Sequence, residues 1–112
     1  MPRFNLLVLT NAVPGREEAF NTWYSDVHLA DVLRVPGIVA AQRFRQAGHQ
    51  RDPGPYPWQY LAIYECETED VREVIAGLKA RSGTAEMPLS DAMEAERYVC
   101  FFEPVTERRV AG

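Results

Sequence analysis

Four short runs of this 112-residue chain are apolar at consecutive positions, and this feature constrains the fold most. A strand whose sheet is covered on one face alternates apolar with polar residues, whereas a strand covered on both faces is apolar throughout. The runs therefore predict strands in a sheet with two buried faces. They are LLVL (6–9), IVAA (38–41), YLAIY (60–64) and VCFF (99–102).

Two amphipathic helices are predicted between these strands. An acidic pair at 17–18 favours the start of the first helix, and Pro36 and Gly37 end it and turn the chain. The second helix is expected over 68–83, with Thr68 as its N-cap. Apolar residues recur at helical spacing in both. They are Phe20, Trp23, Tyr24, Val27 and Ala30 in the first, and Val71, Val74, Ile75 and Leu78 in the second.

The element order predicts an α+β fold, the ferredoxin-like βαββαβ arrangement, as a single domain over residues 1–112. Its antiparallel four-stranded sheet carries both helices on one face. The strands are expected at 4–10, 38–45, 58–67 and 97–103, with a Pro- and Gly-rich hairpin loop at 46–57. Two helices cover only one face of the sheet. The second apolar face is therefore expected to pack against a second copy in a homodimer.

Composition excludes several classes of partner. The chain has 12 basic and 16 acidic residues, a net charge of −4, and its basic residues are scattered, which argues against nucleic acid and membrane surfaces. Cys66 and Cys100 lie in different predicted strands with the first strand between them, so they should stay reduced, as in a cytoplasmic protein. No metal-ligand spacing, nucleophile motif or cofactor motif is present, and neither a metal nor a cofactor is expected.

The motifs VPGREEAF, WYSDVH, DVLRVPG and AAQRFR, followed by the YLAIYE strand, resemble the dimeric α+β barrel superfamily, particularly its EthD-like branch. Relatives include polyketide cyclases, muconolactone isomerases, cofactor-independent monooxygenases and haem-degrading enzymes. The resemblance implies a cleft between sheet and helices that holds a small, mostly apolar molecule. Haem-degrading relatives carry their iron-ligating histidine on the second helix, and 68–83 has none. Ala30 stands where similar sequences often have proline, so the first helix is expected to run straighter past His28.

His28 is the main candidate for chemistry. At 100° per residue, Tyr24, His28 and Asp31 fall within about a 60° arc of one helix. A core-side carboxylate in a last helical turn is unfavourable unless it is paired. A hydrogen bond from His28 to Asp31 would pair it, orient the imidazole and raise the His28 pKa above about 6.5. The alternative is that the chain frays after His28 and Asp31 caps the next turn.

Five further residues are candidates for substrate binding, each with a structural alternative. Tyr60 and Tyr64 share a strand face on which a small residue leaves room for a ligand, although packing on a partner's sheet explains them equally. Arg43 can anchor an anionic or carbonyl oxygen, or extend to the sheet edge. Asn11 can donate to a substrate carbonyl or form an ordinary turn. Trp58 follows the long loop and can close over a pocket.

Two functions remain open from the sequence. The first is a small cofactor-independent enzyme of isomerase, cyclase, dehydratase or monooxygenase type, which acts on an aromatic or polyketide-like molecule with His28 as acid or base. The second is a non-catalytic binding or accessory protein for a hydrophobic metabolite of a degradation or biosynthetic pathway.

Overall fold

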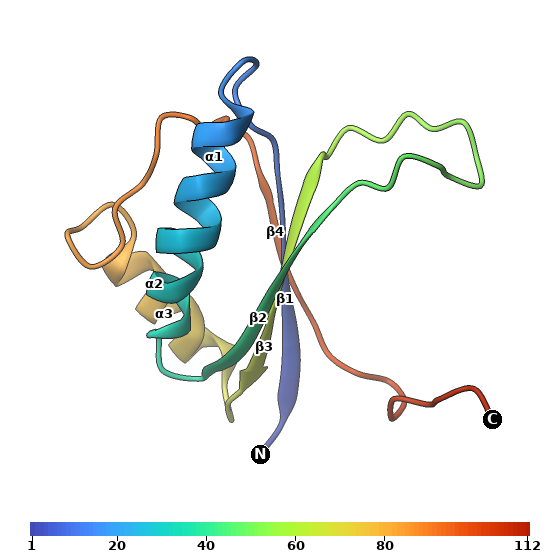
Figure 1. Ribbon diagram of the computed structural model, residues 1–112. Coiled ribbons are helices and arrows are strands. Elements are labelled where there is room, and N and C mark those ends of the chain that lie inside the picture. The colour runs from blue at the N-terminus through green and yellow to red at the C-terminus, as the bar shows by residue number, and fades with distance from the viewer.

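The four strands form one antiparallel sheet in the order β2-β3-β1-β4 in a computed structural model that describes all 112 residues. All helices lie on one side of this sheet (Figure 1). This confirms the predicted ferredoxin-like α+β fold. β1 separates the strands of Cys66 and Cys100, and both cysteines are free thiols. The strands are β1 Arg3–Thr10, β2 Ile38–Arg45, β3 Tyr60–Glu67 and β4 Tyr98–Phe102.

The first helix contains a π-helical turn. It begins as α1 (Glu17–Trp23), passes through the π-helical segment η1 (Tyr24–His28) and ends as α2 (Leu29–Leu33). The Leu29 amide donates to the carbonyl oxygen of Tyr24, five residues back, instead of four. The helix is therefore not a regular α-helix at His28, while the expectation that it runs straighter past this residue stays a prediction. Gly37, at φ +96°, then turns the chain into β2, as the Pro-Gly pair predicts.

The second helix, α3 (Val71–Arg81), begins two residues later than its predicted N-cap implies. Asp70 is the cap, because its carboxylate accepts from the Arg72 amide at 2.9 Å. The Thr68 hydroxyl accepts from the Asp70 amide at 3.2 Å instead, which holds the cap in place.

The sheet places alternate side chains on opposite faces, as its register requires. One set packs under the helices and includes Leu6, Ala62 and Tyr64, each at most 2% exposed. Tyr64 thus faces the helices. The alternative explanation, that this residue packs on a partner's sheet, is therefore wrong. The opposite set forms the open face of the sheet, which nothing covers. Its apolar members include Leu7, Leu9, Phe44, Leu61, Ile63, Tyr98, Cys100 and Phe102.

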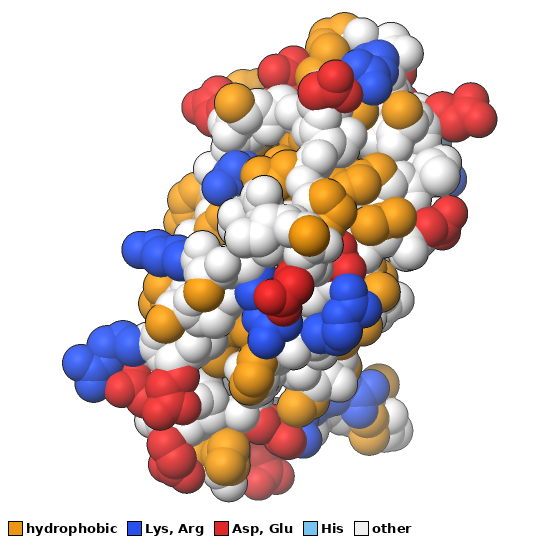
Figure 2. Space-filling view, turned by 90° about the vertical axis from the view of Figure 1, so that its left-hand side faces the viewer, with side chains coloured by type: hydrophobic (Ala, Val, Ile, Leu, Met, Phe, Trp, Pro, Cys, Tyr) orange, Lys and Arg blue, Asp and Glu red, His pale blue; other side chains and the backbone are white.

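The two faces of the molecule differ in chemistry. Charged side chains of both signs are spread over the helix-covered side (Figure 2). On the open face, Phe44, Tyr98 and Phe102 are 39%, 50% and 51% exposed. The loop at 46–59 and the C-terminal tail both extend toward this open side, away from the helices (Figure 1). No helix is both long and apolar enough to span a membrane.

Candidate functional site

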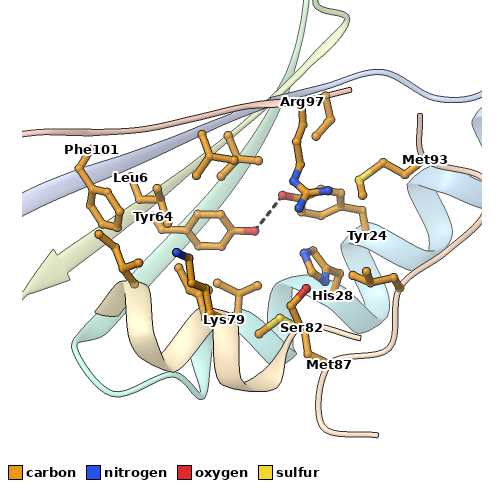
Figure 3. A pocket seen from close by; sticks show the side chains of 17 residues that line it. Leu6, Tyr24, His28, Tyr64, Lys79, Ser82, Met87, Met93, Arg97 and Phe101 are labelled. Carbon is orange, nitrogen blue, oxygen red and sulfur yellow. Dashed lines mark hydrogen bonds between the residues drawn. The ribbon is translucent and has the colours of Figure 1, made fainter. Parts of the chain in front are cut away.

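A cavity of about 420 Å³ lies between the sheet and the helices. Its size is within the range of small-molecule sites. Twelve of the 17 residues that line it are hydrophobic. Side chains from β1, β3, β4, α3 and the first helix converge on it (Figure 3). The residues that bring polar atoms to it are Thr10, Tyr24, His28, Tyr64, Lys79, Ser82 and Arg97.

Tyr24 and Tyr64 meet inside the cavity through their hydroxyl groups, which are 3.0 Å apart (Figure 3). Burial raises the pKa of both phenols, and the neighbouring Tyr24 raises the pKa of Tyr64 further. Both hydroxyls are therefore protonated at neutral pH. Their mutual hydrogen bond uses one of the two O–H groups. The pair keeps one O–H donor for a ligand.

His28 is positioned by aromatic rings. Trp23 stacks on the imidazole with centroids 4.6 Å apart and planes at 23°, and Tyr24 meets it edge-on at 4.8 Å. The Trp23 indole in turn donates to the Pro88 carbonyl at 3.2 Å. A regular helix would set residues 23 and 28 about 140° apart, so the sequence periodicity did not predict the stacking. The π-helical turn, closed by the hydrogen bond from Leu29 to Tyr24, holds more residues per turn and so brings the rings of residues 23 and 28 together.

The imidazole of His28 is neutral in this environment. Burial lowers its pKa to about 4, while the Asp31 carboxylate opposes that shift and Arg97 and Arg43 add to it. Nδ1 is buried and has no hydrogen-bond partner. The predicted rise of the His28 pKa is therefore wrong, because the cost of desolvating an imidazolium exceeds the attraction of Asp31.

Asp31 does not form the predicted hydrogen bond with His28. Its side chain is buried and forms an ion pair with Arg34, one turn further along the helix, and its Oδ2 has no partner. The π-helical turn changes the angular spacing assumed for residues 24, 28 and 31, and Asp31 does not line the cavity. The chain does not fray after His28 either, because α2 continues the helix to Leu33.

Arg43 and Tyr60 lie outside the lining of the cavity. The Arg43 guanidinium lies 4.5 Å from the centroid of the Tyr24 ring and donates to Ser25 Oγ at 2.8 Å. The Tyr60 hydroxyl accepts from Asn21 Nδ2 at 3.0 Å. Arg43 and Tyr60, which were predicted to contact a ligand, thus contact the first helix and Tyr24 instead.

Asn11 and Trp58 are also placed outside the cavity lining. The Asn11 amide donates to the Pro57 carbonyl at 2.8 Å and accepts from the Gln59 amide at 2.7 Å, so it anchors the end of the long loop. Trp58 precedes β3 instead of lying within it. These bonds join the end of β1 to the segment just before β3, so the Asn11 amide is not free to reach a ligand in the cavity.

The structure adds Lys79, Ser82 and Arg97, which the sequence reasoning missed. Lys79 had an ordinary explanation as a cation in the last turn of α3. Helical periodicity could have indicated that Lys79 lines the cavity, because it follows the lining residue Ile75 by four positions and so lies on the same helix face. Arg97 shares its parity with Val99 and Phe101, both of which line the cavity.

Comparison with solved structures identifies the fold. The chain is similar to an EthD-like protein from Ralstonia eutropha, with a TM-score of 0.70, 12% identity and 96% of each chain covered. The chain shares the ferredoxin-like α+β fold of this EthD-like protein. It is also similar to the haem-degrading protein MhuD from Mycobacterium tuberculosis, with a TM-score of 0.64, 14% identity, and coverage of 95% of this chain and 99% of that one.

A dimeric ferredoxin-like protein from Thermobifida fusca is a further relative in structure, with a TM-score of 0.50, 15% identity and 92% of each chain covered. No protein-family model matches the sequence, and no curated protein matches it significantly. At these identities the likeness extends to the fold alone. The site of this chain must be read from its own residues.

The second helix, α3, contains no histidine, so it offers no histidine ligand for a haem iron. No group of three or more His, Cys, Asp or Glu side chains is placed to hold a metal ion. The chemistry that this chain's own side chains offer is proton transfer at His28 and hydrogen bonding from the Tyr24–Tyr64 pair.

Proposed function

We propose that this protein is a small cofactor-independent enzyme that acts on an aromatic or polyketide-like molecule, with His28 as the acid or base. One observation supports this most: a half-buried, neutral imidazole with a buried, unpartnered Nδ1 lines an apolar cavity beside a pair of protonated phenols. A buried polar atom without a partner costs free energy in a structural role. Such a cost is expected where the atom serves a ligand.

The neutral imidazole can accept a proton from an acidic C–H or O–H bond of the ligand. The electron pair left behind moves onto a ligand oxygen, to which the free O–H of the Tyr24–Tyr64 pair donates. The new anion raises the basicity of His28 at the same time. Return of the proton to another atom completes an isomerisation, or assists the loss of water or a ring closure. With dioxygen as a co-reactant, the carbanion can instead be oxygenated.

A ligand panel tests this proposal directly. Phenols, quinones and lactones are first screened by thermal shift, and the ligands that bind are then incubated with protein and analysed for products by mass spectrometry. His28→Asn should lower turnover by about 10² or more and leave the Kd nearly unchanged, because it removes proton transfer but not the cavity. His49→Asn is the matched control, since His49 lies exposed in the long loop. Equal turnover in both variants would refute the role of His28.

The alternative is a binding or accessory protein that sequesters a hydrophobic metabolite. The mostly apolar lining favours this second function, because 12 of its 17 residues are hydrophobic. It predicts that no member of the panel is converted and that His28→Asn weakens binding instead. The same screen therefore separates the two functions.

We also propose that the protein works as a cytoplasmic homodimer of one-domain chains. The exposed apolar open face supports the dimer, and the loop and tail that extend on that side are placed to contact a second copy (Figure 1). The relative from Thermobifida fusca is itself dimeric. Two free thiols, Cys66 and Cys100, are consistent with a reducing compartment.

A further inference from the structure

The cavity contains only positive charge. Lys79 and Arg97 are the only Lys or Arg side chains among the 17 lining residues, and no Asp or Glu is among them. The whole chain is acidic, with 16 acidic and 12 basic residues. A site that gathers two cations and no carboxylate in such a chain has a charge opposite to that of its surroundings.

Neither cation is neutralised within the protein. Six of the ten other basic residues form an ion pair with a carboxylate, namely Arg3, Arg16, Arg34, Arg51, Arg72 and Arg81, and four do not, namely Arg43, Arg45, Arg108 and Arg109. Lys79 and Arg97 form none, although both lie at the exposed rim of the cavity. They come from different elements, Lys79 from α3 and Arg97 from the residue before β4. Figure 3 shows both side chains directed toward the space beside the tyrosine pair.

The rest of the cavity favours a ligand that is mostly apolar. Leu6, Val32, Ile75, Leu78 and Phe101 are among its lining residues, and they offer no hydrogen bonds from their side chains. The free O–H of the Tyr24–Tyr64 pair is a donor, and Lys79 and Arg97 are donors only, so the polar part of the site favours an acceptor with negative charge.

We infer that the ligand is an aromatic or similarly apolar carboxylate, whose anionic group lies between Lys79 and Arg97 while its apolar body fills the cavity. This inference rests on the proposed function in taking this cavity as the ligand site. It adds the charge of the ligand, which neither the fold nor its relatives specify. Recognition of the carboxylate requires no turnover.

Matched probes test the charge preference. The Kd of 2-naphthoate is compared with that of 2-naphthamide, a neutral molecule of nearly the same shape, by calorimetry at low and high salt. The carboxylate should bind about tenfold more tightly at low salt, and salt should weaken only its binding, because exposed charges are screened.

Charge variants identify the residues responsible. Lys79→Gln and Arg97→Gln should each weaken carboxylate binding by roughly fivefold and change amide binding less than twofold, since rim ion pairs are individually weak. Lys79→Arg keeps the charge and should keep the preference. Arg51→Gln, in the exposed loop, removes the same charge away from the cavity and should change nothing. Thermal unfolding of each variant confirms that it is folded.

Three results would overturn the inference: equal Kd values for the two probes, an equal effect of Arg51→Gln, or no binding of either probe at millimolar concentration. Failure of the acid/base proposal has a different signature. A protein that prefers the carboxylate but converts no ligand of the panel would refute catalysis by His28 and leave the carboxylate preference intact.

Discussion

His28 depends on its aromatic neighbours more than on any charged partner. Trp23 stacks on the ring and Tyr24 contacts its edge, so the imidazole is oriented without a hydrogen bond at Nδ1. The same contacts exclude water and favour the neutral form. A carboxylate partner would have had the opposite effect on its charge. The orientation and the neutral state of His28 thus have one common cause.

The pH dependence of stability should reveal this neutral histidine. Its pKa is about 4 in the folded chain and 6.5 when unfolded. Between these values the unfolded chain binds a proton that the folded chain does not, so acid favours unfolding. Relative to His28→Asn, the wild type should lose roughly 3 kcal/mol of unfolding free energy as the pH falls from 7.5 to 4. Urea denaturation of both proteins at several pH values measures the difference.

The groups that face His28 set the size of this effect. Asp31 favours the charged form, whereas Arg97 and Arg43 disfavour it. Since most carboxylates also titrate near pH 4, only the difference between wild type and variant is informative. A difference that does not change with pH would show that the imidazole is not desolvated in solution.

The Tyr24–Tyr64 hydrogen bond should appear in a double-mutant cycle. Tyr64→Phe leaves the buried Tyr24 hydroxyl without its partner and should cost about 1 to 2 kcal/mol of stability. Tyr24→Phe should cost a similar amount. The double variant should cost less than the sum, because no orphaned hydroxyl then remains. Thermal or urea unfolding measures the three values, and strict additivity would mean that the two hydroxyls do not interact.

At the scale of elements, the sequence predicted most of the fold and about half of the polar site. The strand runs, the Pro36-Gly37 stop and the sheet order follow from local propensity and topology, and the structure confirms them. Residues Tyr24, His28 and Tyr64 do line one cavity. The sequence did not predict the π-helical turn, because the angular positions were calculated for a regular helix of 3.6 residues per turn.

The missed cations have a different physical reason. Lys79 and Arg97 occupy a helix end and a strand start, where exposed charges are common and need no function. Only the fold brings them together, because α3 and the start of β4 border the same cavity. Local sequence context suggests Asn11 and Trp58 at strand ends, Arg43 within an apolar strand and Tyr60 on the face of Tyr64. The structure uses Asn11, Arg43 and Tyr60 in internal hydrogen bonds.

The turn between the first helix and β2 should require glycine at position 37. Gly37 has φ +96°, and an added Cβ would lie 2.9 Å from the Val74 side chain. Gly37→Ala should therefore cost about 2 kcal/mol or more of stability, from strain and clash together. Urea unfolding measures this cost.

Two other glycines distinguish the contribution of backbone strain from that of the steric clash. Gly83 has φ +81° with open space around it, so Gly83→Ala should show the strain alone, about 1 kcal/mol. Gly48 has neither a positive φ nor a close neighbour, and its replacement by alanine should be nearly neutral. Equal costs at all three positions would contradict this explanation of the turn.

For the whole molecule, the open face predicts a homodimer. Light scattering should report twice the 12.7 kDa chain mass. Leu61→Glu places a charge on the apolar face of the central strand β3 and should produce monomers at micromolar concentration. Leu33→Glu is the matched control on the opposite side of the sheet, where Leu33 is 38% exposed on α2, and it should leave the dimer intact. A monomeric wild type would contradict the argument from the strands.

The central claim is that His28 moves a proton of a bound ligand. Its most direct test is deuterium exchange: a bicyclic aryl ketone that carries a carboxylate is incubated with the protein in D₂O, and loss of the proton signal next to the carbonyl is followed by NMR. The wild type should exchange this proton well above the rate in buffer, whereas His28→Asn should bind the ketone with a similar Kd and not accelerate exchange. Exchange at the same rate with wild type and variant, both binding the ketone, would contradict the account.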